Sequence, residues 1–150
     1  MEDLKADGKV ATFGLSTHAR PLAVEAMEAG WDPLMVRHSA AHRGAEERVL
    51  PRAAEVGTSV ITFNNTCYGR LLAPCGEHRP PGAADCNRYS LAQPAVRCCL
   101  SAPATLEQLE ETLAALRDPT LPEERRRALE EHGASLYREE TVFRRLVRAL

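Results

Sequence analysis

Short runs of polar side chains follow four apolar segments of the chain, and these runs hold most of the residues that could do chemistry. They are Ser16-Thr17-His18, His38-Ser39, Asn64-Asn65-Thr66 and Ser101 to Thr105. If the apolar segments are parallel strands, their carboxyl ends meet at one edge of the sheet, where functional loops gather. The pattern predicts a ligand-facing rim there. The alternative is that any loop between a strand and a helix needs polar, turn-forming residues.

The run Ser101 to Thr105 also has the sequence features of a helix start. Thr105 followed by Gln108 three residues later is typical of a capping box. Free backbone N–H groups at a helix start, together with the hydroxyls of Ser101 and Thr105, could also hold an anion. The sequence predicts the cap, with a ligand contact possible in addition.

The five cysteines form an odd set without the paired spacing of a metal site: Cys67, Cys75, Cys86, Cys98 and Cys99. We expect reduced thiols that pack as small hydrophobic side chains in a cytoplasmic protein. A zinc site from Cys67, Cys75, His78 and Cys86 is the alternative on ligand chemistry alone. Their spacings match no common zinc pattern, so no metal is expected.

Strand-like and helix-like segments alternate along the chain, and this alternation predicts the elements that position the polar runs. The predicted strands are Val10–Leu15, Pro33–His38, Ser59–Phe63 and Val96–Leu100. The predicted helices are Pro21–Ala29, Ala45–Val56, Ala83–Ala92 and Leu106–Asp118, and Pro51 is expected to kink or split the second of them. The connection Asn64–Gly82 is long, polar and rich in proline and glycine, and GRLLAPCG within it is predicted to form no regular element. Four such units imply an α/β fold with a parallel sheet.

Two further helices are predicted after residue 121. The first begins at Pro122 and ends at Gly133, and the second runs over Ser135–Leu150. The second places Leu136, Phe143, Leu146, Val147 and Leu150 along one apolar face. We expect a single domain over residues 1–150, with the strand–helix units in 1–116 and the terminal helices in 121–150.

Composition excludes several classes of protein. The chain of 150 residues is 44% hydrophobic and 27% charged, which is typical of a globular protein. A formal net charge of −2 argues against a nucleic-acid-binding protein, which would carry a clustered basic excess. The sequence contains no run of about 18 apolar residues, so no membrane-spanning helix is predicted. The opening MEDLKADGK lacks the apolar core of a signal peptide.

Four segments in register resemble the second half of the aldo/keto reductases. They are GKVATFGLSTH, WDPLMVRHSAAHRGAEERVLP, GTSVITFNNTCYGRLL and SAPATLEQLEETLAAL. The resemblance covers Leu4 to Ala115 closely and corresponds to the fifth to eighth strands of that family with their helices. It implies half of a (β/α)8 barrel of the TIM type. The family reduces carbonyls with NADPH and without a metal.

The resemblance also assigns a cofactor site. Ser16 and Thr17 match the polar pair that holds the nicotinamide carboxamide, and Met35 matches a glutamine with the same task. Phe63 matches the aromatic that stacks on the nicotinamide, and Asn64 begins the loop along the pyrophosphate. The residues that match the adenosine-phosphate loop and helix start are Ser101 through Thr105, including Ala104, with Gln108.

Several of these positions depart from the family pattern. Thr17 replaces the usual asparagine, Met35 replaces the usual glutamine and Ala102 replaces a usual glycine. Thr112 occupies a position near the adenine where an asparagine is common. Ala104 stands where an arginine or lysine commonly grips the 2′-phosphate. One lost charge-assisted contact costs about 1.5–3 kcal/mol. We therefore expect NADP(H) binding to be weak or vestigial.

The catalytic aspartate, tyrosine, lysine and histidine of the family lie on its first four strands, which have no counterpart here. His18, His38 and His42 are candidate acids, but the only lysines, Lys5 and Lys9, form no Tyr–Lys pair. General acid catalysis needs an acid tuned by such neighbours. We therefore expect an incomplete oxidoreductase half-barrel that is inactive alone.

Two open sheet edges would favour pairing with a second copy or with a separate N-terminal half. The alternative is a non-catalytic nucleotide-binding or scaffold module that kept the phosphate end of the fold. A flavodoxin-like nucleotide binder is less favoured, because no glycine-rich loop follows the first strand.

Overall fold

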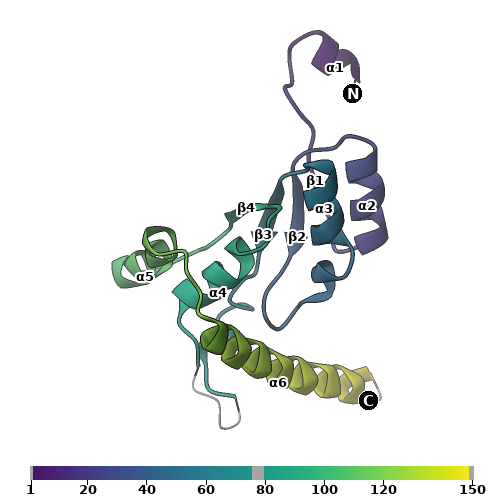
Figure 1. Cartoon of the computed structure of the whole chain (residues 1–150). Helices are drawn as coiled ribbons and strands as arrows, with labels where there is room; N and C mark the ends of the chain where they lie inside the picture. The colour runs from purple at the N-terminus through teal and green to yellow at the C-terminus, as the bar shows by residue number, and fades with distance from the viewer. Residues whose placement is uncertain (1, 76–79, 149–150) are drawn as a thin grey trace.

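The computed structural model describes the backbone of residues 2–75 and 80–148 and the side chains of residues 3–75 and 80–139. Its centre is one parallel sheet in the order β1-β2-β3-β4 (Figure 1). The strands are β1 (Leu15–Ser16), β2 (Leu34–Arg37), β3 (Val60–Phe63) and β4 (Val96–Cys99). The prediction of four parallel strand–helix units is confirmed, and the sheet matches part of a (β/α)8 barrel.

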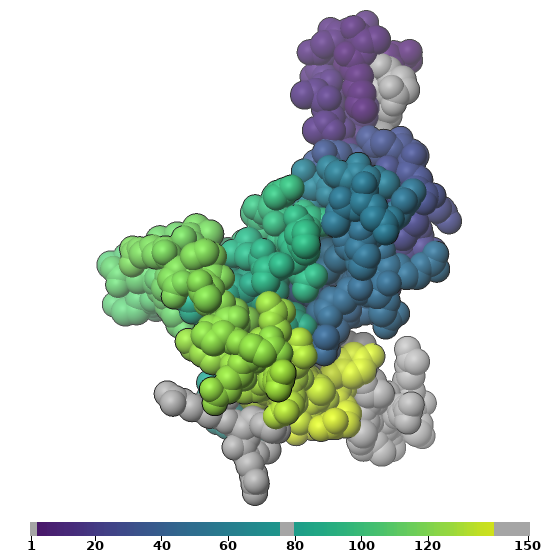
Figure 2. All heavy atoms as spheres, viewed as in Figure 1, coloured from purple at the N-terminus to yellow at the C-terminus, as the bar shows by residue number. Residues whose placement is uncertain are grey.

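The first strand is much shorter than predicted. The prediction placed it over Val10–Leu15, but only Leu15 and Ser16 pair with β2. The amides of Lys9 and Val10 both donate to the carbonyl of Leu4, at 2.9 and 3.2 Å. These bonds tie the segment back to α1 (Glu2–Ala6), a short helix that the sequence reading missed. The N-terminal residues project from the rest of the molecule (Figure 2).

Alternate residues of the central strands point to opposite faces of the sheet. Leu34, Val36 and Val60 are buried against the helices α2 (Arg20–Glu28) and α3 (Val49–Val56). On the other face Met35 and Ile61, which are register partners, remain partly exposed. The sheet therefore has one covered face and one accessible face.

The helix α3 begins later than predicted. A 3₁₀ turn, η1 (Gly44–Glu46), precedes it, and the helix begins at Val49 rather than at Ala45. Pro51 thus lies in the first turn of α3, where the missing N–H has no helical acceptor. The predicted helix is split, but the division lies before Pro51, between η1 and α3. Gly57 ends the helix at φ 78°, in the left-handed region that glycine adopts without strain.

A second buried cluster lies between α4 (Ala83–Leu91) and α6 (Glu123–Arg148). Its large side chains are Leu71, Tyr89, Leu129 and Leu136. Leu71 belongs to the 3₁₀ turn η2 (Arg70–Leu72), within a connection that was predicted to lack regular structure. The connection is fixed there because the Leu71 carbonyl lies 3.1 Å from Nε2 of the buried His132.

The C-terminal region forms one long helix instead of the two predicted. Gly133 does not end α6, because it packs against the backbone of Ala40, where a Cβ would lie 2.5 Å from the carbonyl carbon and oxygen. The predicted apolar face begins with the buried Leu136. The side chains of Phe143, Leu146, Val147 and Leu150 lie outside the described residues.

The helix α5 (Leu106–Arg117) packs on α4, and α6 runs along the lower side of the molecule (Figure 1). None of the helices in the described part of the chain combines the length and the apolar composition needed to cross a membrane.

Candidate functional site

A groove of about 600 Å³ crosses the carboxyl ends of β3 and β4 and reaches the starts of α4 and α5. Residues that the resemblance assigns to the cofactor line it, including Phe63, Asn64, Ser101 and Gln108. Phe63 ends β3 and Asn64 follows it, Ser101 follows β4, and Gln108 lies in the first turn of α5. The sheet topology brings them together because parallel strands end at the same edge.

The loop after β3 holds Asn64 in a conformation that L-residues rarely adopt. Asn64, Cys67 and Tyr68 have φ values of 62°, 54° and 56°. The Oδ1 atom of Asn64 accepts a hydrogen bond of 2.6 Å from the Tyr68 amide. Its Nδ2 atom is buried and has no acceptor among the described residues. A buried donor without an acceptor is costly, so this atom is a candidate contact for a ligand in the groove.

The start of α5 is capped as predicted. Thr105 is the N-cap, and its hydroxyl accepts a hydrogen bond of 3.3 Å from the Gln108 amide. The Gln108 side chain in turn accepts a bond of 2.8 Å from the amide of Ala104. Backbone and Thr105 hydrogen bonds lower the pKa of Glu107 in the same turn. Two donors that could hold an anion are therefore already bonded within the chain.

The groove carries negative rather than positive charge. Of the described residues that line it, none is a lysine or arginine, whereas Glu111 contributes a carboxylate. The Glu111 Oε1 atom accepts a hydrogen bond of 2.8 Å from the Ala83 amide at the start of α4. Gly82 lies close beside it, and a Cβ there would lie 2.7 Å from the same oxygen.

The other predicted site residues lie outside the groove. Ser16 and Met35 are register partners on β1 and β2, and the Thr17 hydroxyl accepts a bond of 3.0 Å from the Ala19 amide. Ala104 and Thr105 lie at the start of α5, beside the groove but not in its lining. The ring of His18 meets Phe63 edge-on at 5.5 Å, so the end of β1 and the groove share one aromatic contact.

A buried polar network behind the strand ends was missed by sequence reasoning. His38 is fully buried, with Nδ1 2.8 Å from Ser90 Oγ and Nε2 3.0 Å from Glu46 Oε1. Tyr89 donates a bond of 2.7 Å to the same Glu46 oxygen, and Arg43 donates to the other at 3.0 Å. Burial alone would raise the pKa of Glu46, but these hydrogen bonds lower it to about 2.

The order serine, histidine, glutamate resembles a hydrolytic triad, but Ser90 has no exposed surface. A nucleophile must reach its substrate, so this network holds the fold together rather than attacking a ligand. The sequence feature that could have indicated this network is the set of polar residues in α4, because Asp85, Asn87 and Ser90 are all buried there.

The five cysteines all lie within the described residues and form no disulfide there, and Cys67, Cys75 and Cys86 are buried. Burial raises the pKa of Cys86 to about 12 and the pKa of Cys99 to about 11. Such thiols are poor nucleophiles. His78, the fourth ligand of the alternative zinc site, lies outside the described residues, and within those residues no group of metal-binding side chains gathers.

Comparison with known proteins shows which solved structures share this fold. No family model matches the chain, and no curated protein matches it. Among solved structures, it is similar to the aldo-keto reductase AKR11C1 from Bacillus halodurans in its holo form, with a TM-score of 0.71 and 21% identity over 87% of this chain and 53% of that one. The apo form gives a TM-score of 0.70 and 20% identity, over 87% and 54%. The chain thus has the fold of part of an aldo-keto reductase barrel and spans about half the length of these structures.

Proposed function

We propose that this chain is half of the barrel of an aldo-keto reductase-type oxidoreductase and that its groove binds a nicotinamide dinucleotide. One observation carries the proposal: Phe63, Asn64, Ser101 and Gln108, which the resemblance assigns to the cofactor, line a single groove. The groove lies at the carboxyl ends of the strands, where α/β folds bind their ligands.

The groove suits the part of a nicotinamide dinucleotide that NAD(H) and NADP(H) share, without the 2′-phosphate. The partly exposed ring of Phe63 offers a surface for an aromatic ring. The Nδ2 atom of Asn64 supplies a donor without an acceptor in the described chain, and Ser101 supplies a hydroxyl. When bound, the cofactor would supply a hydride. The residues of this chain would orient it.

The same groove does not suit an additional 2′-phosphate. Glu111 would repel the phosphate, and no arginine or lysine among the described lining residues offsets it. The Gln108 side chain already holds the Ala104 amide. We therefore propose weak binding of NADP(H), with little preference over NAD(H).

Catalysis by the chain alone is not part of the proposal. Lys5 and Lys9, the only lysines, lie before the sheet, and Lys9 pairs with Asp7 at 2.8 Å. We propose that the chain alone does not reduce carbonyls and that it pairs through its open sheet edges with a second copy or with a complementary N-terminal half. We place it in the cytoplasm, where free thiols persist.

The second candidate is a nucleotide-binding or scaffold module without turnover, which the open edges of the sheet favour. The two functions differ in whether a carbonyl is reduced when the chain is paired with another half-barrel. Nucleotide binding is common to both.

Titration with NADPH and with NADH, followed by cofactor fluorescence, tests the groove. We expect Kd values on the order of 0.1–1 mM for both cofactors. The Glu111→Gln variant should bind NADPH about three- to tenfold more tightly and NADH with a smaller change, because it removes a charge beside the extra phosphate. Glu110→Gln is the matched control, since Glu110 is exposed and does not line the groove. An equal effect of both variants would contradict the placement of the cofactor.

A further inference from the structure

Three side chains form a row across the carboxyl edge of the accessible sheet face. Arg37 of β2 and Phe63 of β3 are register partners. Ser16 of β1 and Met35 of β2 are partners two residues earlier in their strands. Because side chains two residues apart share one face of a strand, this register brings His18 opposite Arg37. The row of His18, Arg37 and Phe63 therefore lies on one face.

The contacts around His18 agree with this arrangement. The pairing of the chain continues past β1, because the Thr17 amide donates a hydrogen bond of 3.1 Å to the Met35 carbonyl. The His18 ring meets the Phe63 ring edge-on, with 5.5 Å between the centroids, although β2 lies between their strands. The two rings thus reach toward each other across the strand that carries Arg37.

Arg37 is a partly buried cation without a partner in the described part of the chain. Its neighbour Val36 is buried beneath the helices, whereas Arg37 is partly exposed on the other face. Its guanidinium forms no hydrogen bond or ion pair with any residue that the structure describes. Charged groups that leave water are normally paired in proteins. The guanidinium is therefore available to an anion that binds from the accessible face.

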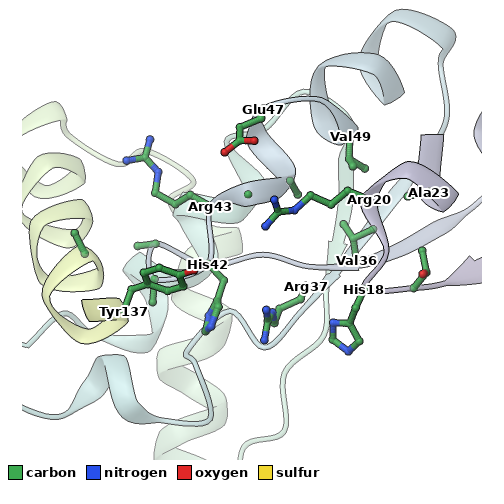
Figure 3. A pocket seen from close by; sticks show the side chains of 16 residues that line it. His18, Arg20, Ala23, Val36, Arg37, His42, Arg43, Glu47, Val49 and Tyr137 are labelled. Atoms are coloured by element: carbon green, nitrogen blue, oxygen red, sulfur yellow. The ribbon is translucent and has the colours of Figure 1, made fainter. Parts of the chain in front are cut away.

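The carboxylate nearest in the fold lies on the other side of β2. A cavity of about 380 Å³ borders the end of this strand, and Glu47 is the one acidic residue among its described lining residues. Figure 3 shows Arg37 and His18 extending to one side of the ribbon, with Glu47 and Arg20 on the other side. Arg20 packs there on the Gly44 backbone. Glu47 therefore does not neutralise Arg37.

The row lies at one end of the cofactor groove. Phe63 belongs to both, since it also lines the groove. The family resemblance assigns Phe63, Ser16 and Thr17 to the nicotinamide, and His18 directly follows Thr17. In a completed barrel this edge stays open at the carboxyl-terminal mouth, where ligands bind. A ligand held by Arg37 would lie beside the nicotinamide ring.

We propose that Arg37, assisted by His18, binds the carboxylate of a short oxo acid beside the nicotinamide. This inference rests on the proposed function, since the cofactor groove supplies the neighbouring ring. A guanidinium binds a carboxylate through two parallel hydrogen bonds, and an imidazole N–H donates one more. A carbonyl that accepts a hydride must lie against the nicotinamide. A ligand held here by its carboxylate therefore carries its carbonyl close to that group.

The rest of the face favours a single charge and a small carbon skeleton. One arginine matches the one negative charge of a monocarboxylate. Met35 and Ile61, one step along the strands from the row, are partly exposed apolar side chains. They offer contact to a methyl or methylene group and supply no further charge. The site therefore prefers a short monocarboxylate over inorganic phosphate.

Ligand-observed NMR of the whole chain at low salt tests this site, with pyruvate as the probe. Pyruvamide is the neutral counterpart of pyruvate, and inorganic phosphate is an anion without a carbon skeleton. We expect saturable binding of pyruvate with a Kd on the order of 1–10 mM, and binding of the other two weaker by about tenfold or more. Saturating NADH should leave pyruvate binding unchanged or strengthen it, because the two ligands adjoin without overlapping.

Arg37→Gln should weaken pyruvate binding about tenfold or more, and His18→Gln about two- to fivefold. Arg37→Lys keeps the charge but not the planar fork, so we expect an intermediate loss of about threefold. Arg48→Gln is the matched control, since Arg48 is exposed at the start of α3 and lines neither the groove nor the cavity. Unfolding midpoints check the fold of each variant. Should Arg37→Gln fail to fold, Arg37→Lys and His18→Gln carry the test.

NADH titration of the same variants separates this inference from the proposed function. Loss of pyruvate binding in Arg37→Gln with unchanged NADH binding would support both. Pyruvate binding that follows the expected order of variants, without NADH binding, would support the carboxylate site and refute the cofactor groove. The absence of saturable pyruvate binding would refute the carboxylate site whether or not NADH binds.

Three further results would overturn the proposal. The first is equal binding of pyruvate and either pyruvamide or phosphate, which would remove the preference for a carboxylate. The second is a loss in Arg48→Gln as large as that in Arg37→Gln, which would show unspecific attraction by charge. The third is displacement of pyruvate by NADH, which would place the carboxylate within the cofactor groove.

Discussion

At the scale of single residues, position after a strand was enough to predict part of the site. Asn64 and Ser101 follow apolar strands, and the parallel sheet brings them to one groove, where Phe63, which only the family resemblance assigned to the site, ends β3. Position could not show that the donor of Asn64 lacks an acceptor or that Glu111 faces the groove, because both depend on how a loop and a helix pack. That part of the site required the structure.

The buried network around His38 could not be predicted for a similar reason. Glu46 and Tyr89 are 43 residues apart, and neither belongs to a recognisable motif. Only the packing of η1 against α4 brings the carboxylate to the phenol and the imidazole. The network makes the stability of the fold depend on pH.

Glu46 should therefore control the acid stability of the protein. Hydrogen bonds with His38, Arg43 and Tyr89 outweigh burial and lower the pKa of Glu46 to about 2, from 4.5 in an unfolded chain. Its contribution to stability is complete above pH 4.5 and is lost as the pH falls toward 2. At neutral pH, Glu46→Gln should lower the free energy of unfolding by about 1–3 kcal/mol.

Urea unfolding at several pH values measures this effect. The wild type should lose stability on acidification more steeply than Glu46→Gln. Glu47→Gln, at an exposed neighbouring position, should follow the wild type. Equal pH slopes for wild type and Glu46→Gln would show that the carboxylate is not stabilised in the folded state.

At the scale of elements, alternation of apolar runs predicted the sheet well and the element ends less well. β2 and β3 lie within the predicted segments because each alternates between a buried and a partly exposed face. β1 is short because residues 9 and 10 are bonded to Leu4 instead of to β2. Gly133 was read as the end of a helix, whereas its lack of a side chain serves close packing on Ala40.

Gly133→Ala tests this role of the glycine. In an isolated helix the substitution would stabilise by about 0.5–1 kcal/mol. In α6 the new Cβ would lie 2.5 Å from the Ala40 carbonyl. We expect a net destabilisation of about 1–3 kcal/mol, measured by thermal or urea unfolding. Ser135→Ala, two residues along the same helix, should leave the stability unchanged or raise it slightly. A stabilised Gly133→Ala protein would refute the close approach.

At the scale of the whole molecule, a four-stranded parallel sheet has two open edges and one accessible face. On that face Met35, Ile61 and Cys98 form a row across β2, β3 and β4. Parallel sheets normally have both faces covered. A second copy that supplies four more strands would cover this face and complete an eight-stranded barrel.

Light scattering should accordingly give a mass of about twice the 16.5 kDa of one chain. Ile61→Glu would place a charge in the row across the sheet and should shift the protein toward the monomer by at least about tenfold in dimerisation constant. Leu116→Glu is the control, because Leu116 is 67% exposed on α5 and lies outside the row. A wild-type protein that stays monomeric at high concentration would contradict the pairing.

The central claim is that the groove across β3 and β4 binds a nicotinamide dinucleotide. Its most direct test is a fluorescence titration of the whole chain with NADPH and NADH, for the wild type, Phe63→Ala and the control Phe13→Ala, whose ring contacts Trp31 outside the groove. We predict saturable binding of both cofactors with similar Kd values, weakened about tenfold in Phe63→Ala and unchanged in Phe13→Ala. No saturable binding by the wild type, or equal binding by Phe63→Ala, would contradict it.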